Sequence, residues 1–344
     1  MTNQKCTTGE IRPKRESLSE CDKLKDVIQK GRRLVIFLHD YPDPDAIASG
    51  WILSRIGAHF GIRTRMVYGG RLGRAENRYM VELLKIPLHR VNNHETDIRK
   101  TDILAIVDAQ PGTGNNSFPS GKFKPHIVID HHPLQSRVKA DFLAVSTRFG
   151  ACTTLALKYF NDCNLKIDQG LATAVAYAII SETQDFLRES TPADHAAMVS
   201  VMPHVNQRKL ARIRHPRRER EYYRAVAKAM HHVAIAKNLC ICHAGPVFIP
   251  ELVAEIADLL NAMKGVSWCL ATGYYEKERS MILSLRTGRN KPPAGRVMQN
   301  MVRGLGRGGG HSKMAGGMAP CPNRDEYERM CGVITERFLR IFKA

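Results

Sequence analysis

The chain has 344 residues, which predicts about two domains, each long enough to bury its own hydrophobic core. Because 52 Lys and Arg face 33 Asp and Glu, the net charge is +19, which favours a polyanionic partner such as nucleic acid, a nucleotide or an acidic membrane surface. With 43% hydrophobic and 25% charged residues, the composition excludes a mainly disordered or membrane-spanning chain.

The sequence carries no sign of export. No apolar run is long enough to cross a bilayer, and the N-terminal segment lacks the apolar core of a secretory signal, so we expect a cytoplasmic protein. The nine cysteines form no C-x-x-C pair, so we expect neither a disulfide framework nor a structural zinc site. Cys240 and Cys242 are two residues apart in an apolar run, which indicates packing on one face of a strand.

The first domain is predicted from alternating patterns. Residues 1–18 are polar and basic and are predicted to be a loose arm. Residues 19–205 alternate short apolar runs with helical patterns, which is typical of an α/β domain with a parallel sheet and helices on its faces. The expected strands are residues 34–38, 65–68, 103–107 and 126–129, and the expected helices are residues 47–60 and 171–180.

Residues 206–228 are predicted to be a basic helical linker, because residues 206–224 contain eight Lys or Arg against two Glu. A solvated connector and an arm that contacts nucleic acid both remain open for it. Residues 229–344 are predicted to form a second, smaller α/β domain, with a helix at 251–263, strands at 267–275 and 280–287, and a glycine-dense loop at 304–317.

Potential metal ligands follow three of the predicted strands. They are His39, Asp43 and Asp45 after the first strand, Asp108 after the 103–107 strand, and Asp130, His131 and His132 after the 126–129 strand. A single Asp after a strand is usually a helix cap or a turn former. Because the carboxyl ends of parallel strands lie along one edge of a sheet, these groups are expected to converge in one crevice.

The first cluster favours a two-metal centre. Pro44 fixes the backbone between Asp43 and Asp45, so the two carboxylates can bind different ions. Together with His39 they form a mixed nitrogen and oxygen set that suits Mn²⁺ better than Mg²⁺ or Ca²⁺, with zinc and cobalt still open. Two such ions can support displacement at a phosphoryl group, and the positive charge would attract a phosphate-bearing substrate.

The glycine-dense loop is the candidate substrate loop of the second domain. Seven of its fourteen residues are glycine, so its backbone N–H groups can approach phosphate oxygens closely. The residues expected to contact substrate are Arg307, Gly309, Gly310, His311 and Lys313. A flexible turn is the alternative, and neither a P-loop nor a dinucleotide-binding fingerprint is present.

Taken together, these motifs resemble the DHH phosphoesterase family. HDYPDPDAIASG at 39–50, VDAQ at 107–110, the Asp130-His131-His132 triplet and GGGHSKMAGG at 308–317 occur in the family order and cover nearly the whole chain. The resemblance implies a DHH catalytic domain at 19–205 and a DHH-associated substrate-binding domain at 229–344. It is strongest to the group that degrades very short oligoribonucleotides or dephosphorylates 3′-phosphoadenosine 5′-phosphate.

The resemblance also implies the roles of the site residues. His39 and Asp43 would hold one Mn²⁺ ion, Asp45 and His131 the other, and Asp108 would bridge the two. His132 would face the scissile phosphate, and Asp130 would orient the neighbouring ligands.

One motif departs from the family pattern. Relatives commonly carry Ser/Thr-Asp-Thr after the apolar helix, whereas this chain has Ser181-Glu182-Thr183. Glu182 is therefore assigned as the remaining ligand of the second ion, with Asp185 as its competitor. The family pattern also places Arg286 against the substrate, and Arg74, Asn77 and Arg78 are further candidate substrate contacts, with an ordinary basic helix start as the alternative.

The implied function is hydrolysis of short oligoribonucleotides and linear dinucleotides to mononucleotides by a two-metal-activated hydroxide. Conversion of 3′-phosphoadenosine 5′-phosphate to AMP is open as a second activity. We expect no stable binding of duplex DNA and no membrane partner, and a homodimer remains open. The alternatives are a single-strand exonuclease of the RecJ kind, a pyrophosphatase of the same superfamily, and a nucleotide-binding regulatory protein with impaired catalysis.

Overall fold

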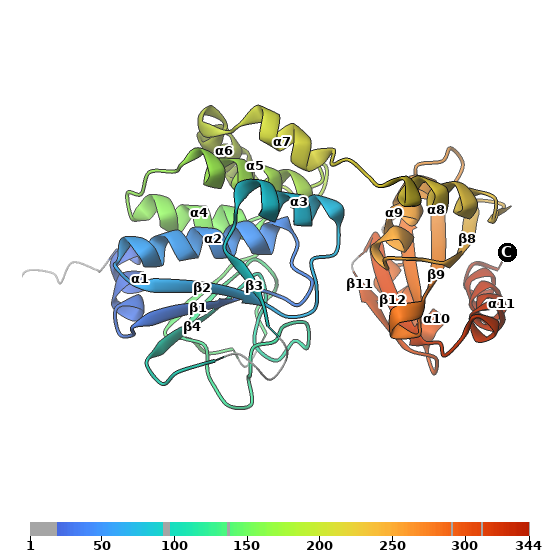
Figure 1. Cartoon of the computed structure of the whole chain (residues 1–344), viewed down its shortest axis with the longest axis horizontal. Coiled ribbons are helices and arrows are strands. Elements are labelled where there is room, and N and C mark those ends of the chain that lie inside the picture. The colour runs from blue at the N-terminus through green and yellow to red at the C-terminus, as the bar shows by residue number, and fades with distance from the viewer. Residues whose placement is uncertain (1–18, 92–96, 136–137, 290–291, 311, 344) are drawn as a thin grey trace, which may run out of the picture. The chain divides into compact units, whose positions relative to one another are not determined.

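The computed structural model describes residues 19–91, 97–135, 138–289, 292–310 and 312–343. The chain divides into two compact units, residues 1–216 and 217–344 (Figure 1). The predicted arm at 1–18 lies outside the described residues. The segment predicted to be a linker contains two helices, α7 (Gln207–Arg214) in the first unit and α8 (Arg220–Met230) in the second.

The first unit contains a six-stranded parallel sheet with the order β3-β2-β1-β4-β5-β6. Its strands are β1 (Arg33–Phe37), β2 (Arg63–Tyr68), β3 (Leu88–Arg90), β4 (Asp102–Val107), β5 (Ile127–Asp130) and β6 (Phe142–Val145). The strands predicted from apolar runs are confirmed. Since the strand order reverses between β1 and β4, the crevice typical of open α/β sheets lies at the carboxyl ends of these two strands.

Both faces of this sheet are buried, which explains the nearly continuous apolar runs. Leu34 and Ile36 belong to the apolar cluster under the helices, whereas Val35 and Phe37 belong to a cluster on the opposite face. The helices α2 (Pro44–His59), α4 (Cys152–Asp162) and α5 (Gln169–Glu182) gather on one face (Figure 1). In the described residues the other face is covered by loop segments, where the ring of Phe118 meets that of Phe37 edge-on.

Local sequence explains where the helices begin. Asp43 precedes α2, and its Oδ1 accepts hydrogen bonds from the backbone N–H groups of Asp45 and Ala46, while Pro44 occupies the first turn. The predicted apolar helix is confirmed as α5, which is buried from Leu171 to Ile179. The other helices of this unit are α1 (Glu20–Ile28), α3 (Ala75–Leu84) and α6 (Pro192–Val201). Among the described helices none is long and apolar enough to cross a membrane.

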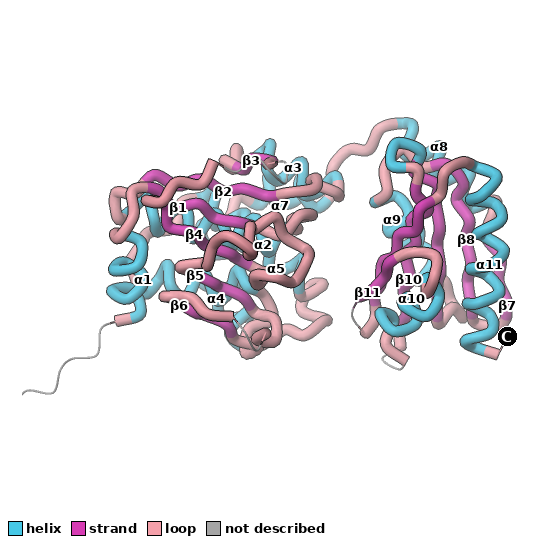
Figure 2. The backbone as a smooth tube through the Cα atoms, turned by 90° about the horizontal axis from the view of Figure 1, so that it is seen from below, coloured by secondary structure: helices cyan, strands magenta, loops and turns pink. Residues whose placement is uncertain are grey.

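The second unit has a mixed six-stranded sheet with the order β11-β12-β10-β9-β8-β7. Its strands are β7 (Val233–Ala236), β8 (Leu239–Pro246), β9 (Trp268–Tyr275), β10 (Ser280–Thr287), β11 (Arg307–Gly310) and β12 (Met314–Pro320). The helix α9 (Glu251–Asn261) connects the parallel pair β8 and β9, and all other pairs are antiparallel. α8 and α9 pack on one face, and α10 (Ala294–Val302) and α11 (Arg324–Phe342) on the other (Figure 2).

The prediction of a glycine-dense loop at 304–317 is wrong, because most of this segment forms the antiparallel pair β11 and β12. A Cβ added at Gly308 would lie 2.7 Å from Cγ of Met298 in α10, whereas one added at Gly309 would meet nothing within 4 Å. Glycine at position 308 therefore lets α10 pack closely against the hairpin. Because glycine has no side chain, this segment lacks the alternation of apolar and polar residues that usually predicts a strand.

The cysteines gave one confirmed and one wrong expectation. Cys240 and Cys242 are both buried in the same apolar cluster of β8, as predicted. Cys21 of α1 and Cys163, which follows α4, form a disulfide across 142 residues of sequence, so the expectation of no disulfide does not hold for this pair. The packing of α1 against α4 creates this pair, and the spacing of the cysteines contains no sign of it.

Candidate metal centre

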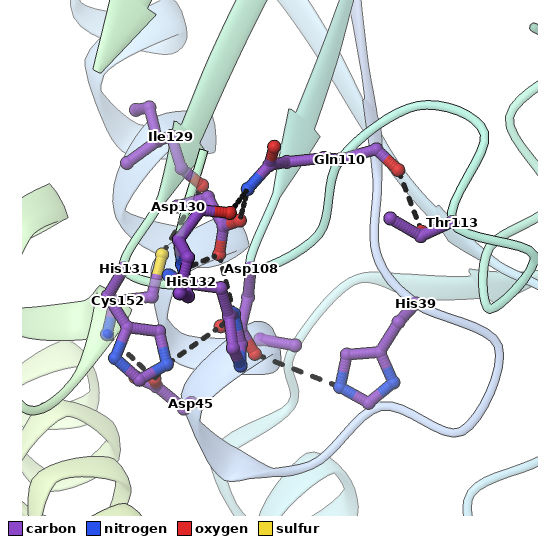
Figure 3. A network of polar contacts seen from close by, with 12 residues as sticks. His39, Asp45, Asp108, Gln110, Thr113, Ile129, Asp130, His131, His132 and Cys152 are labelled. Carbon is purple, nitrogen blue, oxygen red and sulfur yellow. Dashed lines mark hydrogen bonds and ion pairs between the residues drawn. The ribbon is translucent and has the colours of Figure 1, made fainter. Parts of the chain in front are cut away.

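Three strand ends bring the predicted ligands together at the edge of the first sheet (Figure 3). The β1 strand leads to His39 and to Asp43 at the start of α2, the β4 strand leads to Asp108, and the β5 strand leads to His131 and His132. β1 and β4 border the point where the strand order reverses, and β5 is the next strand beyond β4. The convergence follows from the parallel topology, in which every carboxyl end reaches the same edge.

The donor atoms form two groups that share Asp108. One group is His39, Asp43 and Asp108, and the other is Asp108, His131 and His132, with the atoms of each group within 4.8 Å of one another. Nε2 of His39 lies 3.8 Å from carboxylate oxygens of both Asp43 and Asp108. Nε2 of His131 lies 3.5 Å from Oδ1 of Asp108. Asp108 is the residue common to both groups, so it is the carboxylate that both would use if they held ions.

Asp108 is unsatisfied as it stands. Its side chain is 5% exposed, and its Oδ1 is buried without a hydrogen-bond partner. Burial, together with the negative charges of Asp45 and Asp43, raises the pKa of Asp108 well above its usual range. Its backbone is in the left-handed region, with φ of 54°, which Asp tolerates better than most residues. A divalent cation would neutralise these charges, so the residues present fit a metal site.

The His131 ring is oriented for ligation. The Phe149 carbonyl can only accept, so Nδ1 of His131 carries the hydrogen and donates to it at 3.4 Å. In the neutral ring Nε2 carries the lone pair, and it lies 3.5 Å from Oδ1 of Asp108 and 3.8 Å from Oδ2 of Asp45. A partner of this kind on the second ring nitrogen is typical of histidines that bind metal ions.

Asp45 lies at the same edge, but its carboxylate is held by the start of α4. One oxygen accepts from the N–H of Cys152 and the other from the N–H of Thr153, both at 2.7 Å. The hydroxyl of Thr153 also donates to the Asp45 carbonyl at 3.1 Å. The N-terminus of a helix stabilises a carboxylate in this position, and Asp45 lies outside the two ligand groups.

His132 is held by a buried chain of hydrogen bonds (Figure 3). Its Nδ1 donates to Oδ1 of Asp130 at 2.8 Å, and this hydrogen bond raises the pKa of His132. Oδ2 of Asp130 accepts from Nε2 of Gln110 at 2.6 Å, and Oε1 of Gln110 accepts from the backbone N–H of Gln135 at 2.8 Å. Asp130 is 1% exposed, whereas the ring of His132 is 43% exposed and is the accessible end of the chain.

Glu182 and Asp185 have different surroundings. Burial and the negative charges of Asp43 and Asp45 raise the pKa of Glu182 to about 8. Glu182 is therefore close enough to interact electrostatically with these two carboxylates. Asp185 is 58% exposed and accepts from Nη2 of Arg214 at 2.8 Å. The electrostatic surroundings therefore favour Glu182 as the acidic group that belongs to the cluster.

Most of the other predicted contact residues of the first unit have internal partners. Asn77 is buried and donates from Nδ2 to the Pro42 carbonyl at 3.2 Å, which anchors the loop between His39 and Asp43. Arg78 donates to backbone carbonyls of the preceding loop, and Arg74 precedes the first residue of α3. These contacts match the helix-start alternative for this segment.

In the second unit, Arg286 is 7% exposed and is paired with Asp258, and its Nη1 donates to Oγ of Ser284 at 2.9 Å. The remaining candidates lie on or beside the hairpin: Arg307, Gly309 and Gly310 on β11, and Lys313 just before β12. His311 lies outside the described residues.

The sequence did not predict the residues that form hydrogen bonds to the candidate ligands and their neighbours. Gln110, Phe149, Cys152 and Thr153 all make hydrogen bonds to site residues. Gln110 follows Asp108 closely in VDAQ, which was a weak signal for it. The contacts at 149–153 come from a helix start far from the motifs in sequence, and two of them use backbone N–H groups that every residue type except Pro possesses.

Solved structures share this fold, and one of them is a DHH domain, the kind of domain that the motifs resemble. An exopolyphosphatase-related protein from Bacteroides fragilis superposes with a TM-score of 0.71 at 14% identity, over 94% of this chain and 98% of that chain. A DHH domain of a member of the s1p family of ribosomal proteins superposes with a TM-score of 0.53 at 13% identity, over 93% of this chain and 89% of that chain.

The proteins with similar sequences are longer than the segments that match this chain. An uncharacterized protein of Methanocaldococcus jannaschii is 28% identical over 307 residues, which are 89% of this chain and 62% of that protein. A probable manganese-dependent inorganic pyrophosphatase of Lactobacillus johnsonii is 29% identical over 170 residues, which are 48% of this chain and 53% of that protein. The matches thus cover little more than half of these relatives' lengths. No protein-family model matches the chain.

Proposed function

We propose that this chain is a divalent-metal-dependent phosphoesterase. The observation that carries the proposal is the buried Oδ1 of Asp108, which has no hydrogen-bond partner and belongs to the carboxylate that two groups of ligand atoms share. Ions bound there would supply a Lewis acid that activates water and neutralises charge on a phosphoryl group. Two Mn²⁺ ions suit this mixed nitrogen and oxygen set, and the pyrophosphatase relative is named as manganese-dependent.

The residues of the chain have separate tasks in this reaction. The residues that hold the ions are His39, Asp43, Asp45, Asp108, His131 and Glu182. His132 donates a hydrogen bond to a phosphoryl oxygen and stabilises the charge that develops there. Asp130 accepts from Nδ1 of His132, which fixes the ring and favours its protonated form.

The proposed substrates are short oligoribonucleotides and linear dinucleotides, with 3′-phosphoadenosine 5′-phosphate as a second substrate. The order of the DHH motifs supports this choice, and the net charge of +19 supports a phosphate-rich partner. A single-strand exonuclease, a pyrophosphatase and a regulatory nucleotide-binding protein are the competing assignments, and they differ in which substrate, if any, is turned over.

The test is a substrate panel with Mn²⁺, in which release of mononucleotide and of phosphate are both measured. The panel contains a dinucleotide, a long single strand, pyrophosphate and 3′-phosphoadenosine 5′-phosphate. We expect rapid turnover of the dinucleotide, and a loss of more than about a hundredfold in Asp108→Asn, because a ligand matters more than the groups that orient it. Asp141→Asn is the matched control, since Asp141 is exposed at the amino end of β6.

The other outcomes separate the alternatives. Turnover of only the long strand would assign the exonuclease, and turnover of only pyrophosphate would assign the pyrophosphatase. Tight nucleotide binding without product at any Mn²⁺ concentration would assign the regulatory protein. Full activity of Asp108→Asn would refute the site itself.

A further inference from the structure

A buried carboxylate outside the ligand groups binds the chain segment that contacts two residues of the site. Asp194 of α6 is completely buried, and its Oδ2 accepts from the N–H and the hydroxyl of Thr191 at 2.8 and 2.7 Å. The bond from the Thr191 N–H belongs to the capping box of its own helix. Asp194 also accepts from the Gly150 N–H at 2.9 Å and from the Thr154 hydroxyl at 2.6 Å, and helix capping does not require these two bonds.

The segment 149–154, which Asp194 binds near both ends, also holds two site residues. The Phe149 carbonyl accepts from the His131 ring, and the N–H groups of Cys152 and Thr153 donate to the Asp45 carboxylate. Along this segment, the contacts to Asp194 at positions 150 and 154 enclose those to Asp45 at 152 and 153. A shift of the segment would therefore move Asp45 and turn His131 at the same time.

Position 150 is shaped for this contact. A Cβ added at Gly150 would lie 2.5 Å from the Glu189 carbonyl oxygen and 2.6 Å from Oδ2 of Asp194. Only glycine leaves room for the carboxylate to reach the backbone N–H at this point. The close approach ties the segment to the start of α6 with no side chain between them.

We propose that Asp194 is a positioning residue for the metal centre. Its carboxylate fixes the segment 149–154, and this segment fixes the orientation of Asp45 and the ring of His131. The inference rests on the metal centre of the proposed function. Groups that orient metal ligands typically change metal affinity about 10- to 100-fold when they are removed, so the effect belongs to metal binding and not only to folding.

The experiment measures Mn²⁺ binding by the full chain without substrate, using the electron paramagnetic resonance signal of the free ion. In Asp194→Asn the side chain keeps its shape, but one acceptor oxygen is replaced by an NH₂ donor. We expect about tenfold weaker binding at one of the two sites. Unfolding by urea is measured in parallel, so that loss of stability is separated from loss of affinity.

Asp102→Asn is the matched control. Asp102 is also buried in the first unit, and it accepts hydrogen bonds from Arg33 and from the backbone N–H of Arg99. It is the first residue of β4, so it lies at the end of the strand away from the site. We expect this variant to lose stability and to keep the Mn²⁺ affinity of the wild type.

A milder variant keeps the inference testable if Asp194→Asn does not fold. Thr154→Val removes only the hydroxyl that donates to Asp194, and Thr64→Val removes a comparable hydroxyl contact to Ser54 at 2.6 Å elsewhere in the unit. We expect weaker Mn²⁺ binding in Thr154→Val alone. Wild-type affinity in Thr154→Val and in any folded Asp194→Asn would overturn the inference. Absence of Mn²⁺ binding in the wild type would instead overturn the metal centre.

Discussion

The buried carboxylates at the edge of the first sheet differ in the hydrogen bonds that they accept. This difference decides which of them gains most from a bound cation. Asp45 is satisfied by two backbone N–H groups of α4, and Asp130 by His132 and Gln110. Asp108 has a buried oxygen with no hydrogen-bond partner. Because a buried carboxylate oxygen without a hydrogen bond is costly, Asp108 is the group that a bound cation would stabilise most.

The competition between Glu182 and Asp185 can be decided by Mn²⁺ affinity. We expect Glu182→Gln, which removes the charge and keeps the shape, to weaken binding at least about tenfold. The reason is that Glu182 is half-buried, and partial burial together with the charges of Asp43 and Asp45 raises its pKa to about 8. Asp185→Asn should bind within about twofold of the wild type, since Asp185 is exposed and paired with Arg214. The reverse pattern would assign Asp185 as the ligand.

At this scale the sequence predicted the identities of the groups but not their partners. The positions of His39, Asp108 and His131 after apolar runs were enough to predict that they meet, because strand topology alone brings them together. The hydrogen bonds to Asp45 depend on how α4 packs, and the backbone N–H groups that make them leave no trace in the residue types. The residue patterns therefore predicted the candidate ligands but not the groups that hydrogen-bond to them.

Among the elements, the hairpin of β11 and β12 shows how one residue type serves two purposes. Gly308 and Gly317 face α10, and a Cβ added at either position would lie 2.7 Å from an atom of Met298. A Cβ added at Gly309 would have no neighbour within 4 Å. The first two permit close packing of a helix on a sheet. Gly309 leaves the other face free of a side chain.

The pair Gly308 and Gly309 gives a test with an internal control. We expect Gly308→Ala to destabilise the second unit by about 1–3 kcal/mol, because the new methyl group overlaps Met298 and Val302. Gly309→Ala should change the free energy of unfolding by less than about 0.5 kcal/mol. Urea unfolding followed by the fluorescence of Trp268 measures both. Equal effects of the two substitutions would contradict this account of the hairpin.

Elements with a clear apolar pattern were predicted, and those without one were not. β1, β4, β5 and α5 are buried along most or all of their length, so their runs of apolar residues identified them. β11 has the sequence RGGG and offers no apolar alternation at all. The disulfide between Cys21 and Cys163 was missed for a related reason, since only the packing of α1 on α4 brings these residues together.

At the scale of the whole molecule, the chain is built from two units with separate cores. The apolar clusters of the first unit are drawn from residues 24–213, and those of the second from residues 229–338. The ligand groups and the disulfide both belong to the first unit. Metal binding and reduction should therefore act on one unit and leave the other unchanged.

The two tryptophans make this separation measurable, because Trp51 lies in α2 and Trp268 in β9. In Trp268→Phe, which keeps Trp51, Mn²⁺ at about 100 times its Kd should raise the free energy of unfolding by about 2.7 kcal/mol for each ion bound. A reducing agent should lower it by about 2–5 kcal/mol through loss of the disulfide. In Trp51→Phe, which keeps Trp268, neither treatment should move the urea midpoint. A shift of that midpoint by Mn²⁺ would mean that the two units unfold as one.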